Sequence, residues 1–197
     1  MISQTCPVNR LYGVVGILAL LFSRPANASP TTKIATGTAA VAGAAVAAWL
    51  VIAGPLVANF EGYAKRPYVD TVGTGHPITW CYGETKADGP VPPLSAIFTK
   101  QECTKELEHS LSARYAPAID RCIRVVLPPH RKAALVSAAY NLGPSAVCNG
   151  PIARYINAGN VVAGCNALLA YDHAAGRRLP GLTRRRQAER AMCLRND

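Results

Sequence analysis

The pattern of apolar and charged positions divides the chain into two regions. Residues 1–58 contain no Asp or Glu and only three Lys or Arg, which leaves 18 of the 21 basic residues and all 11 acidic residues after Asn59. The first region contains two uncharged apolar runs, Leu11–Phe22 and Ile34–Val57. The pattern therefore predicts an apolar N-terminal region over residues 1–58 and a folded domain over residues 59–197.

The first apolar run is typical of a secretory signal peptide. Arg10 precedes a run of 12 residues, and the small residues Ala26-Asn27-Ala28 follow it. A charged start, a short apolar run and an A-x-A-like site are the parts of such a peptide. We expect residues 1–29 to be a signal peptide, with an added N-terminal segment or sequence upstream of the natural start as the alternatives.

The second run, Ile34–Val57, has 24 uncharged residues, of which nine are Ala and three are Gly. A helix of this length measures about 36 Å, sufficient to cross a bilayer. Small side chains bury little area, so the helix should hold the membrane weakly. We predict a membrane-spanning segment within residues 30–58; an ordinary anchor or a buried Ala-rich core helix are the alternatives. The flanking basic residues do not decide its orientation.

After Asn59 the pattern predicts a small β-containing part followed by several helices. Residues 68–73 and 78–83 have the character of short strands. Thr99-Lys100-Gln101-Glu102 is a capping box that begins a helix, which Pro117 should kink or break. Further helices are expected from Pro129 to about Leu142 and over 152–157, 161–171 and 184–194. The predicted fold is α+β, mainly α.

Charge and cysteine content narrow the function classes. The domain carries a charge of 18 minus 11, or +7, which suits nucleic acid, anionic membranes or anionic wall polymers. No nucleic-acid-binding motif is present, so we expect no nucleic-acid partner. The six domain cysteines form no C-x-x-C, which disfavours zinc. They indicate an oxidising compartment and up to three disulfides in any of 15 pairings, with Cys6 left over. Buried free thiols are the alternative.

Glu61 and Asp70 are the candidate catalytic residues. They lie nine positions apart, the first among apolar and aromatic residues and the second near a turn. Glycosidic hydrolysis needs one carboxyl that donates a proton and one that stays ionised, in unlike environments. Two acids in a loop are more often simply solvated, so the pair alone is weak evidence.

The residues around this pair resemble the phage-type lysozymes, the glycoside hydrolase family of tailed-phage endolysins. That family has a Glu, eight residues, an Asp, a short spacer and a Thr, often within T-x-C-Y-G, which is matched here by Glu61, Asp70 and Thr79–Gly83. The resemblance extends in order from Phe60 to Leu194. Its later segments are Ala134–Ser137, Ala139–Gly143, Ile156–Asn160 and Gly181–Arg186, followed by Glu189, Arg190 and Cys193.

The resemblance implies a lysozyme-like domain of two lobes, with Glu61 as general acid, Asp70 as the opposite carboxylate and Thr79 holding a water. We expect the two carboxyl groups to face one cleft at roughly 6.5–9.5 Å, the separation typical of inversion. The spacer between Asp70 and Thr79 has eight residues instead of the family's usual five. The T-x-C-Y-G context favours Thr79 over Thr74.

Two other basic features have plainer interpretations. His76 lies in the inserted Gly-Pro stretch and is expected to be a solvated loop residue. The run Arg184-Arg185-Arg186 near Arg190 and Arg195 is expected to be the solvated face of the last helix.

The function implied is an endolysin that hydrolyses the bond between N-acetylmuramic acid and N-acetylglucosamine in peptidoglycan. A lytic transglycosylase, or a non-catalytic membrane-tethered wall-binding protein, is the alternative. The segment Ile34–Val57 resembles the signal-arrest-release helix of some family members, which implies a place in the inner membrane first and in the periplasm later. We expect a monomer that needs no cofactor or metal.

Overall fold

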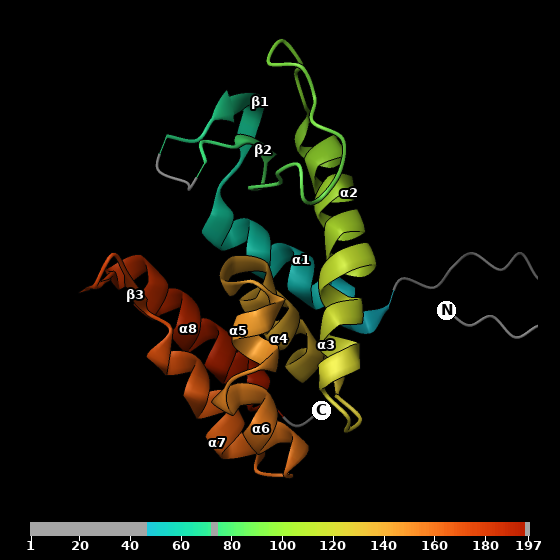
Figure 1. Ribbon diagram of the computed structural model, residues 1–197. Helices are drawn as coiled ribbons and strands as arrows, with labels where there is room; N and C mark the ends of the chain where they lie inside the picture. Colours follow the sequence, from blue (N-terminus) through green and yellow to red (C-terminus); the bar gives the residue numbers. More distant parts are fainter. Residues whose placement is uncertain (1–46, 72–74, 196–197) are drawn as a thin grey trace, which may run out of the picture. The chain divides into compact units, whose positions relative to one another are not determined.

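The computed structural model describes residues 47–71 and 75–195, all within one compact unit, Ala42–Asp197. The predicted signal peptide and residues 30–46 of the predicted membrane segment lie outside the described residues. The described part is mostly helical with two small antiparallel sheets (Figure 1). This confirms the expected α+β, mainly α, fold class.

Helix α1 (Ala48–Glu61) contains the residues at the boundary between the two predicted regions. Its side chains Ala53 and Val57 are fully buried, and α1 packs on α4 (Pro129–Leu142). Residues 48–57, assigned from the sequence to the membrane segment, are therefore part of the folded domain in this structure. No helix within 47–71 or 75–195 is long and apolar enough to cross a membrane.

Strands β1 (Ala64–Val69) and β2 (Ile78–Cys81) form an antiparallel hairpin in which Tyr68 pairs with Thr79. The first strand begins at Ala64, four residues before the expected start at Tyr68, and the ladder is irregular between these two residues. That irregularity accommodates Pro67, which has no N–H to give to a regular ladder.

The long connection that follows begins at the predicted capping box. Thr99 accepts a hydrogen bond from the Glu102 amide and its own amide donates to the Glu102 carboxylate at 2.7 Å. The helical path then continues through α2 (Lys100–Ser110), the π-helix η1 (Leu111–Tyr115) and α3 (Ala116–Cys122). Pro117 therefore does not end it: the wider π-turn, with Ala116 N–H donating to Leu111 O, comes directly before the proline.

Helix α4 is the centre of the helical part, because α1 and α8 (Pro180–Cys193) both pack on it. Its residues 133–139 are all buried, which explains their small side chains. The remaining elements are α5 (Pro144–Cys148), α6 (Pro151–Asn157), α7 (Val161–Ala167), the 3-10 turn η2 (Leu168–Ala170), and the hairpin of β3 (His173–Ala174) and β4 (Arg177–Arg178).

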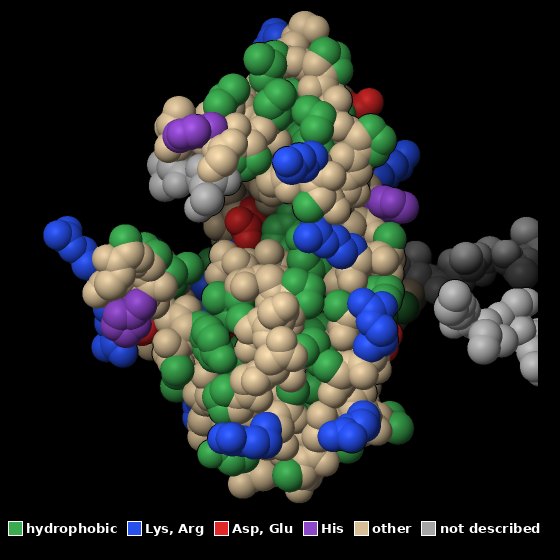
Figure 2. Space-filling view, viewed as in Figure 1, with side chains coloured by type: hydrophobic (Ala, Val, Ile, Leu, Met, Phe, Trp, Pro, Cys, Tyr) green, Lys and Arg blue, Asp and Glu red, His purple; other side chains and the backbone are tan. Residues whose placement is uncertain are grey.

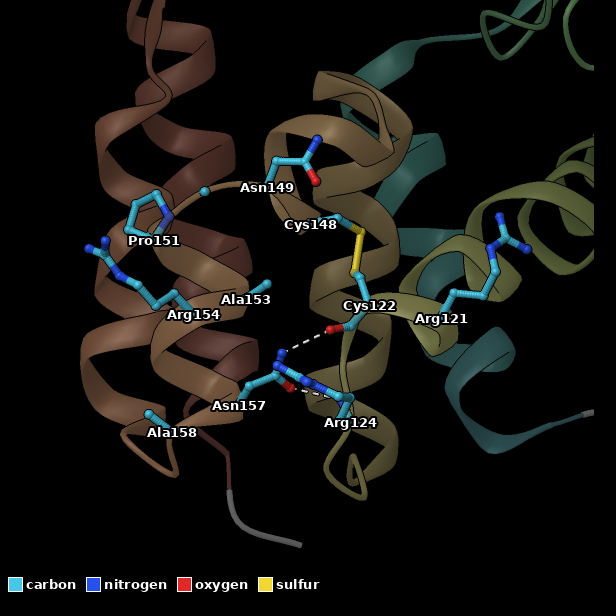
Figure 3. Close-up of a pocket in the computed structure, with 11 residues that line it drawn as sticks. Arg121, Cys122, Arg124, Cys148, Asn149, Pro151, Ala153, Arg154, Asn157 and Ala158 are labelled. Atoms are coloured by element: carbon cyan, nitrogen blue, oxygen red, sulfur yellow. Dashed lines mark hydrogen bonds between the residues drawn. A yellow bond between two sulfur atoms is a disulfide. The ribbon is translucent and has the colours of Figure 1, made fainter.

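The six domain cysteines form three disulfides, which confirms the expected disulfide content. The pairs are Cys81–Cys103, Cys122–Cys148 and Cys165–Cys193. The paired cysteines lie 22, 26 and 28 positions apart in the sequence. Beside the second pair, the Asn157 side chain donates to the Cys122 carbonyl oxygen at 2.8 Å and accepts from the Arg124 amide at 2.7 Å (Figure 3). The end of α3 is thereby fixed to α5 and α6.

Candidate active site

A cleft of about 420 Å³ lies between the end of α1 and the β1–β2 hairpin. Glu61, Asp70 and Thr79 all line it, so the structure brings the three residues predicted from the sequence together. Figure 2 shows this face hollowed, with an acidic side chain inside the hollow. The other lining residues are Gly62, Tyr63, Ala64, Tyr68, Pro77, Cys81, Gly83 and Thr85.

Glu61 is the last residue of α1, and Gly62 ends the helix with a φ of 75° that favours glycine. A carboxylate at a helix C-terminus is opposed by the helix dipole. The Arg185 guanidinium offsets this, because its Nη1 donates to Glu61 Oε1 at 2.5 Å. The Arg185 side chain is 3% exposed and that of Glu61 is 20% exposed, so the pair is held at the wall of the cleft.

Arg185 is itself fixed by buried acceptors. Its Nε donates to Glu189 Oε1 at 3.1 Å, its Nη2 donates to the Ser137 carbonyl oxygen at 3.3 Å, and its guanidinium lies 5.6 Å from the Phe60 ring centroid. The Ser137 hydroxyl also donates to Glu189 at 2.8 Å. Burial raises the pKa of Glu189, and the neighbouring arginines oppose that rise. The direction of the Glu61 carboxyl is therefore set by a chain of buried side chains.

This arrangement corrects the expectation for the arginine run. Arg184 is exposed, but Arg185 and Arg186 are 3% and 0% exposed and both pair with Glu189. The sequence signal was present: Arg185 and Arg186 lie four and three positions before Glu189, the spacing of ion pairs on one helix face. Arg185 is thus a candidate site residue that the sequence analysis missed.

Asp70 and Thr79 are positioned by the hairpin. The Asp70 amide donates to the Pro77 carbonyl oxygen at 2.9 Å, which fixes the residue directly after β1. Thr79 is 5% exposed, and its hydroxyl is buried without a hydrogen-bond partner among the described residues. A hydroxyl at the wall of a cleft that has unused hydrogen-bonding capacity can bind a water molecule or a substrate hydroxyl. The insertion in the spacer leaves Thr79 at the cleft.

The cleft continues on the other side of Glu61. A second concavity of about 680 Å³ is lined by Glu61 and Arg185 together with residues 179–182 at the start of α8. Glu61 therefore lies where two hollows meet, an arrangement that suits an extended polymer bound across the acid.

A different concavity, of about 710 Å³, lies at the Cys122–Cys148 disulfide (Figure 3). Its lining includes Arg121, Arg124 and Arg154 but no carboxyl group, so it lacks the acid that glycosidic cleavage requires. Within the described ranges, no group of three or more His, Cys, Asp or Glu could hold a metal ion.

A mainly helical fold with two carboxyl groups lining one cleft is the arrangement of a lysozyme-like glycosidase. The phage lysozyme family model matches residues 58–189. The SAR-endolysin of Enterobacteria phage P21 is 34% identical over 84% of this chain and 96% of its own length. That of Bacteriophage PS119 is 35% identical over 79% of this chain and 90% of its own. The structure of a P22 lysozyme mutant has a TM-score of 0.64 and 27% identity, and covers 73% of this chain and 96% of that one.

The chain belongs to the phage lysozyme family. It is a cell-wall-lysing endolysin, and its activity is that of a glycoside hydrolase.

Proposed function

We propose that this endolysin is a muramidase that hydrolyses the β-1,4 bond between N-acetylmuramic acid and N-acetylglucosamine, with Glu61 as general acid and Asp70 as the opposite carboxylate. The observation that carries the proposal is that Glu61, Asp70 and Thr79 line one cleft. The glycan strand would lie along this cleft and the second hollow that also contains Glu61.

The environment of Glu61 suggests which oxygen carries the transferred proton. Oε1 accepts from Arg185, whereas Oε2 faces Gly83, where an added Cβ would lie 3.6 Å from it. Since Gly83 lines the cleft, Oε2 is the oxygen available to protonate the leaving glycosidic oxygen. Arg185 keeps Oε1 occupied and so keeps Oε2 directed at substrate.

Asp70 and Thr79 would act on the other face of the sugar. The Asp70 carboxylate accepts a proton from water, and the Thr79 hydroxyl, which has no hydrogen-bond partner among the described residues, holds that water for attack at the anomeric carbon. This division of roles favours hydrolysis over a lytic transglycosylase, which needs a catalytic Glu and no Asp.

Replacement of Glu61 tests the proposal, because Glu61→Gln keeps the shape of the side chain and removes its proton. We expect the purified variant to lose lysis of peptidoglycan suspensions by about 10²- to 10⁴-fold while still folding. The matched control is Glu106→Gln, an exposed glutamate on α2, which should keep normal activity. Near-normal lysis by Glu61→Gln would refute the assignment of Glu61 as the general acid.

We also propose that the segment Ile34–Val57 spans the inner membrane before release into the periplasm. Its last ten residues are the first part of α1, where Ala53 and Val57 are fully buried in the domain core. Ala53 and Val57 cannot lie in the bilayer and in the domain core at the same time, so the membrane-spanning state and the folded state exclude each other. Glu61 ends the same helix, so the folded site requires the segment to leave the membrane. Relatives described as SAR-endolysins support this order of events.

Replacement of Ala42, Ala45 and Ala48 by Leu tests release. Each added CH₂ stabilises the spanning state by about 0.8 kcal/mol, and Ala48 is exposed in the folded domain, so its replacement leaves the core intact. We expect the triple Leu variant to stay in the membrane and to delay lysis after an uncoupler is added, whereas wild type is released. A triple Ser variant at these positions should be released at least as readily as wild type. Lysis by a wild type that remains wholly membrane-bound would contradict release.

A further inference from the structure

A second glutamate, Glu84, is fully buried behind the catalytic acid. It is 0% exposed and follows Gly83, the residue that lies against Glu61 Oε2. A Cβ at position 83 would also lie 3.9 Å from the Tyr140 hydroxyl. The turn Tyr82–Glu84 is therefore the wall that Glu61 meets, and Tyr140 of α4 supports that wall from behind.

The two oxygens of Glu84 have different environments. Oε2 accepts the Tyr82 amide at 2.7 Å, whereas Oε1 is buried with no donor among the described residues. The Tyr140 hydroxyl is the side-chain group beside this carboxyl that interacts with it. However, that hydroxyl already donates its single proton to the Tyr82 carbonyl oxygen at 3.1 Å. An ionised Glu84 thus leaves one buried acceptor without a donor, whichever way Tyr140 turns.

We propose that Glu84 is a positioning residue for Glu61, present as a neutral carboxylic acid that donates its proton to the Tyr140 hydroxyl. With that proton, three hydrogen bonds close a ring: Tyr82 N–H to Glu84, Glu84 O–H to Tyr140, and Tyr140 O–H to the Tyr82 carbonyl oxygen. Every buried group in the ring then has a partner. The closed ring holds the turn against Glu61. The proposal rests on Glu61 being the general acid.

The charged and titratable neighbours support the neutral state. Asp88 interacts with Glu84 from the same loop, Tyr115 from η1 and Tyr140 from α4. None of these is a cation, and the nearby Arg114 is paired with Asp88 at 2.8 Å. Burial raises the pKa of Glu84 to about 7, and the Asp88 charge adds to the rise, while hydrogen bonds oppose it.

This arrangement predicts how stability depends on pH. A carboxyl whose pKa is higher in the folded state binds its proton more tightly there, so its stabilising contribution is complete below the ordinary value of 4.5. That contribution is lost as the pH rises towards about 7. Glu84→Gln supplies a permanent neutral mimic: its carbonyl oxygen accepts from Tyr82 and its NH₂ donates to Tyr140.

The experiment compares wild type with Glu84→Gln and Glu84→Ala, using Glu106→Gln as the exposed control. The difference between the Tm of Glu84→Gln and the Tm of wild type should increase from pH 5 to pH 8. The same difference for Glu106→Gln should not change with pH. At pH 5.5, Glu84→Gln should keep kcat on soluble peptidoglycan fragments within about threefold, whereas Glu84→Ala should lose kcat on the order of 10²-fold with little change in KM. An infrared difference spectrum at pH 6 should show a protonated carboxylic acid in Glu61→Gln, where Glu61 cannot contribute one, and should lose that band in the double variant Glu61→Gln/Glu84→Gln.

The outcomes separate this proposal from the proposed function. A relative Tm that stays flat with pH, or an infrared carboxylic acid band that survives in Glu61→Gln/Glu84→Gln, would overturn the neutral glutamate. A loss of kcat in Glu84→Gln at pH 5.5 as large as in Glu84→Ala would overturn the positioning role. The Tm and infrared measurements need no catalysis. Their failure would therefore leave Glu61 as the acid, and an active Glu61→Gln would leave the state of Glu84 unaffected.

Discussion

The two sides of the cleft hold their carboxyl groups by different means. On the α1 side, Glu61 ends a helix and its carboxyl meets the buried guanidinium of Arg185. On the hairpin side, Asp70 is placed by a backbone hydrogen bond to Pro77, and the neighbouring Thr79 hydroxyl has no partner within the described residues. One side is fixed by side-chain ion pairs, and the other by strand register.

The difference matches what each side would do in catalysis. A proton donor must keep one direction towards the glycosidic oxygen, and buried ion pairs fix a direction well. A side that receives water needs unused hydrogen-bonding capacity, which Thr79 has. The comparison therefore predicts that variants on the α1 side affect stability and activity together, whereas variants on the hairpin side affect activity alone.

The largest effect on folding is expected from Arg185→Met. It leaves the buried carboxylate of Glu189 with fewer partners and removes the donor to Glu61. Breaking a buried ion pair by removing one partner costs about 3–5 kcal/mol, so urea unfolding should show a loss of this size together with reduced lysis. Arg184→Met, at the exposed neighbour, should change stability by less than about 0.5 kcal/mol. Equal stability of the two variants would refute the role given to the buried network.

A smaller effect is expected on the hairpin side from Thr79→Val, which keeps the shape and removes the hydroxyl. No hydrogen bond to a described residue is lost, so the unfolding free energy should stay equal or rise. Lysis should fall by roughly tenfold because the attacking water loses its holder, and Thr79→Ser should restore it. A loss of stability in Thr79→Val with unchanged lysis would contradict the claim that variants on the hairpin side affect activity alone.

The sequence predicted most of the fold where the signals are local. The capping box at Thr99 begins α2 as expected, and proline and glycine bound α4. The helix pattern over 129–142 was readable because small apolar residues there fill one central element. The hairpin of β3 and β4 was missed, since its strands have two residues each and carry no apolar alternation.

The candidate site was readable only in part. The three cleft residues lie in one short motif, so a resemblance found them, and their roles stay predictions. Arg185 meets Glu61 across 124 positions, and Glu84 meets Tyr140 through packing of distant elements. A run of three arginines is usually solvated; the spacing to Glu189 indicates a pairing for two of them, and the fold adds that these two are buried. Long-range partners of a carboxyl leave little trace in the sequence around it.

The chemistry of the product tests the central claim most directly. Wild-type protein is incubated with purified peptidoglycan, and the released sugars are analysed by mass spectrometry and by NMR of the newly formed anomeric centre. Hydrolysis with Asp70 opposite Glu61 predicts reducing N-acetylmuramic acid ends whose first-formed anomer is inverted. Release of 1,6-anhydro sugars would contradict the account, because that product needs Glu61 alone and gives Asp70 and Thr79 no part in the reaction.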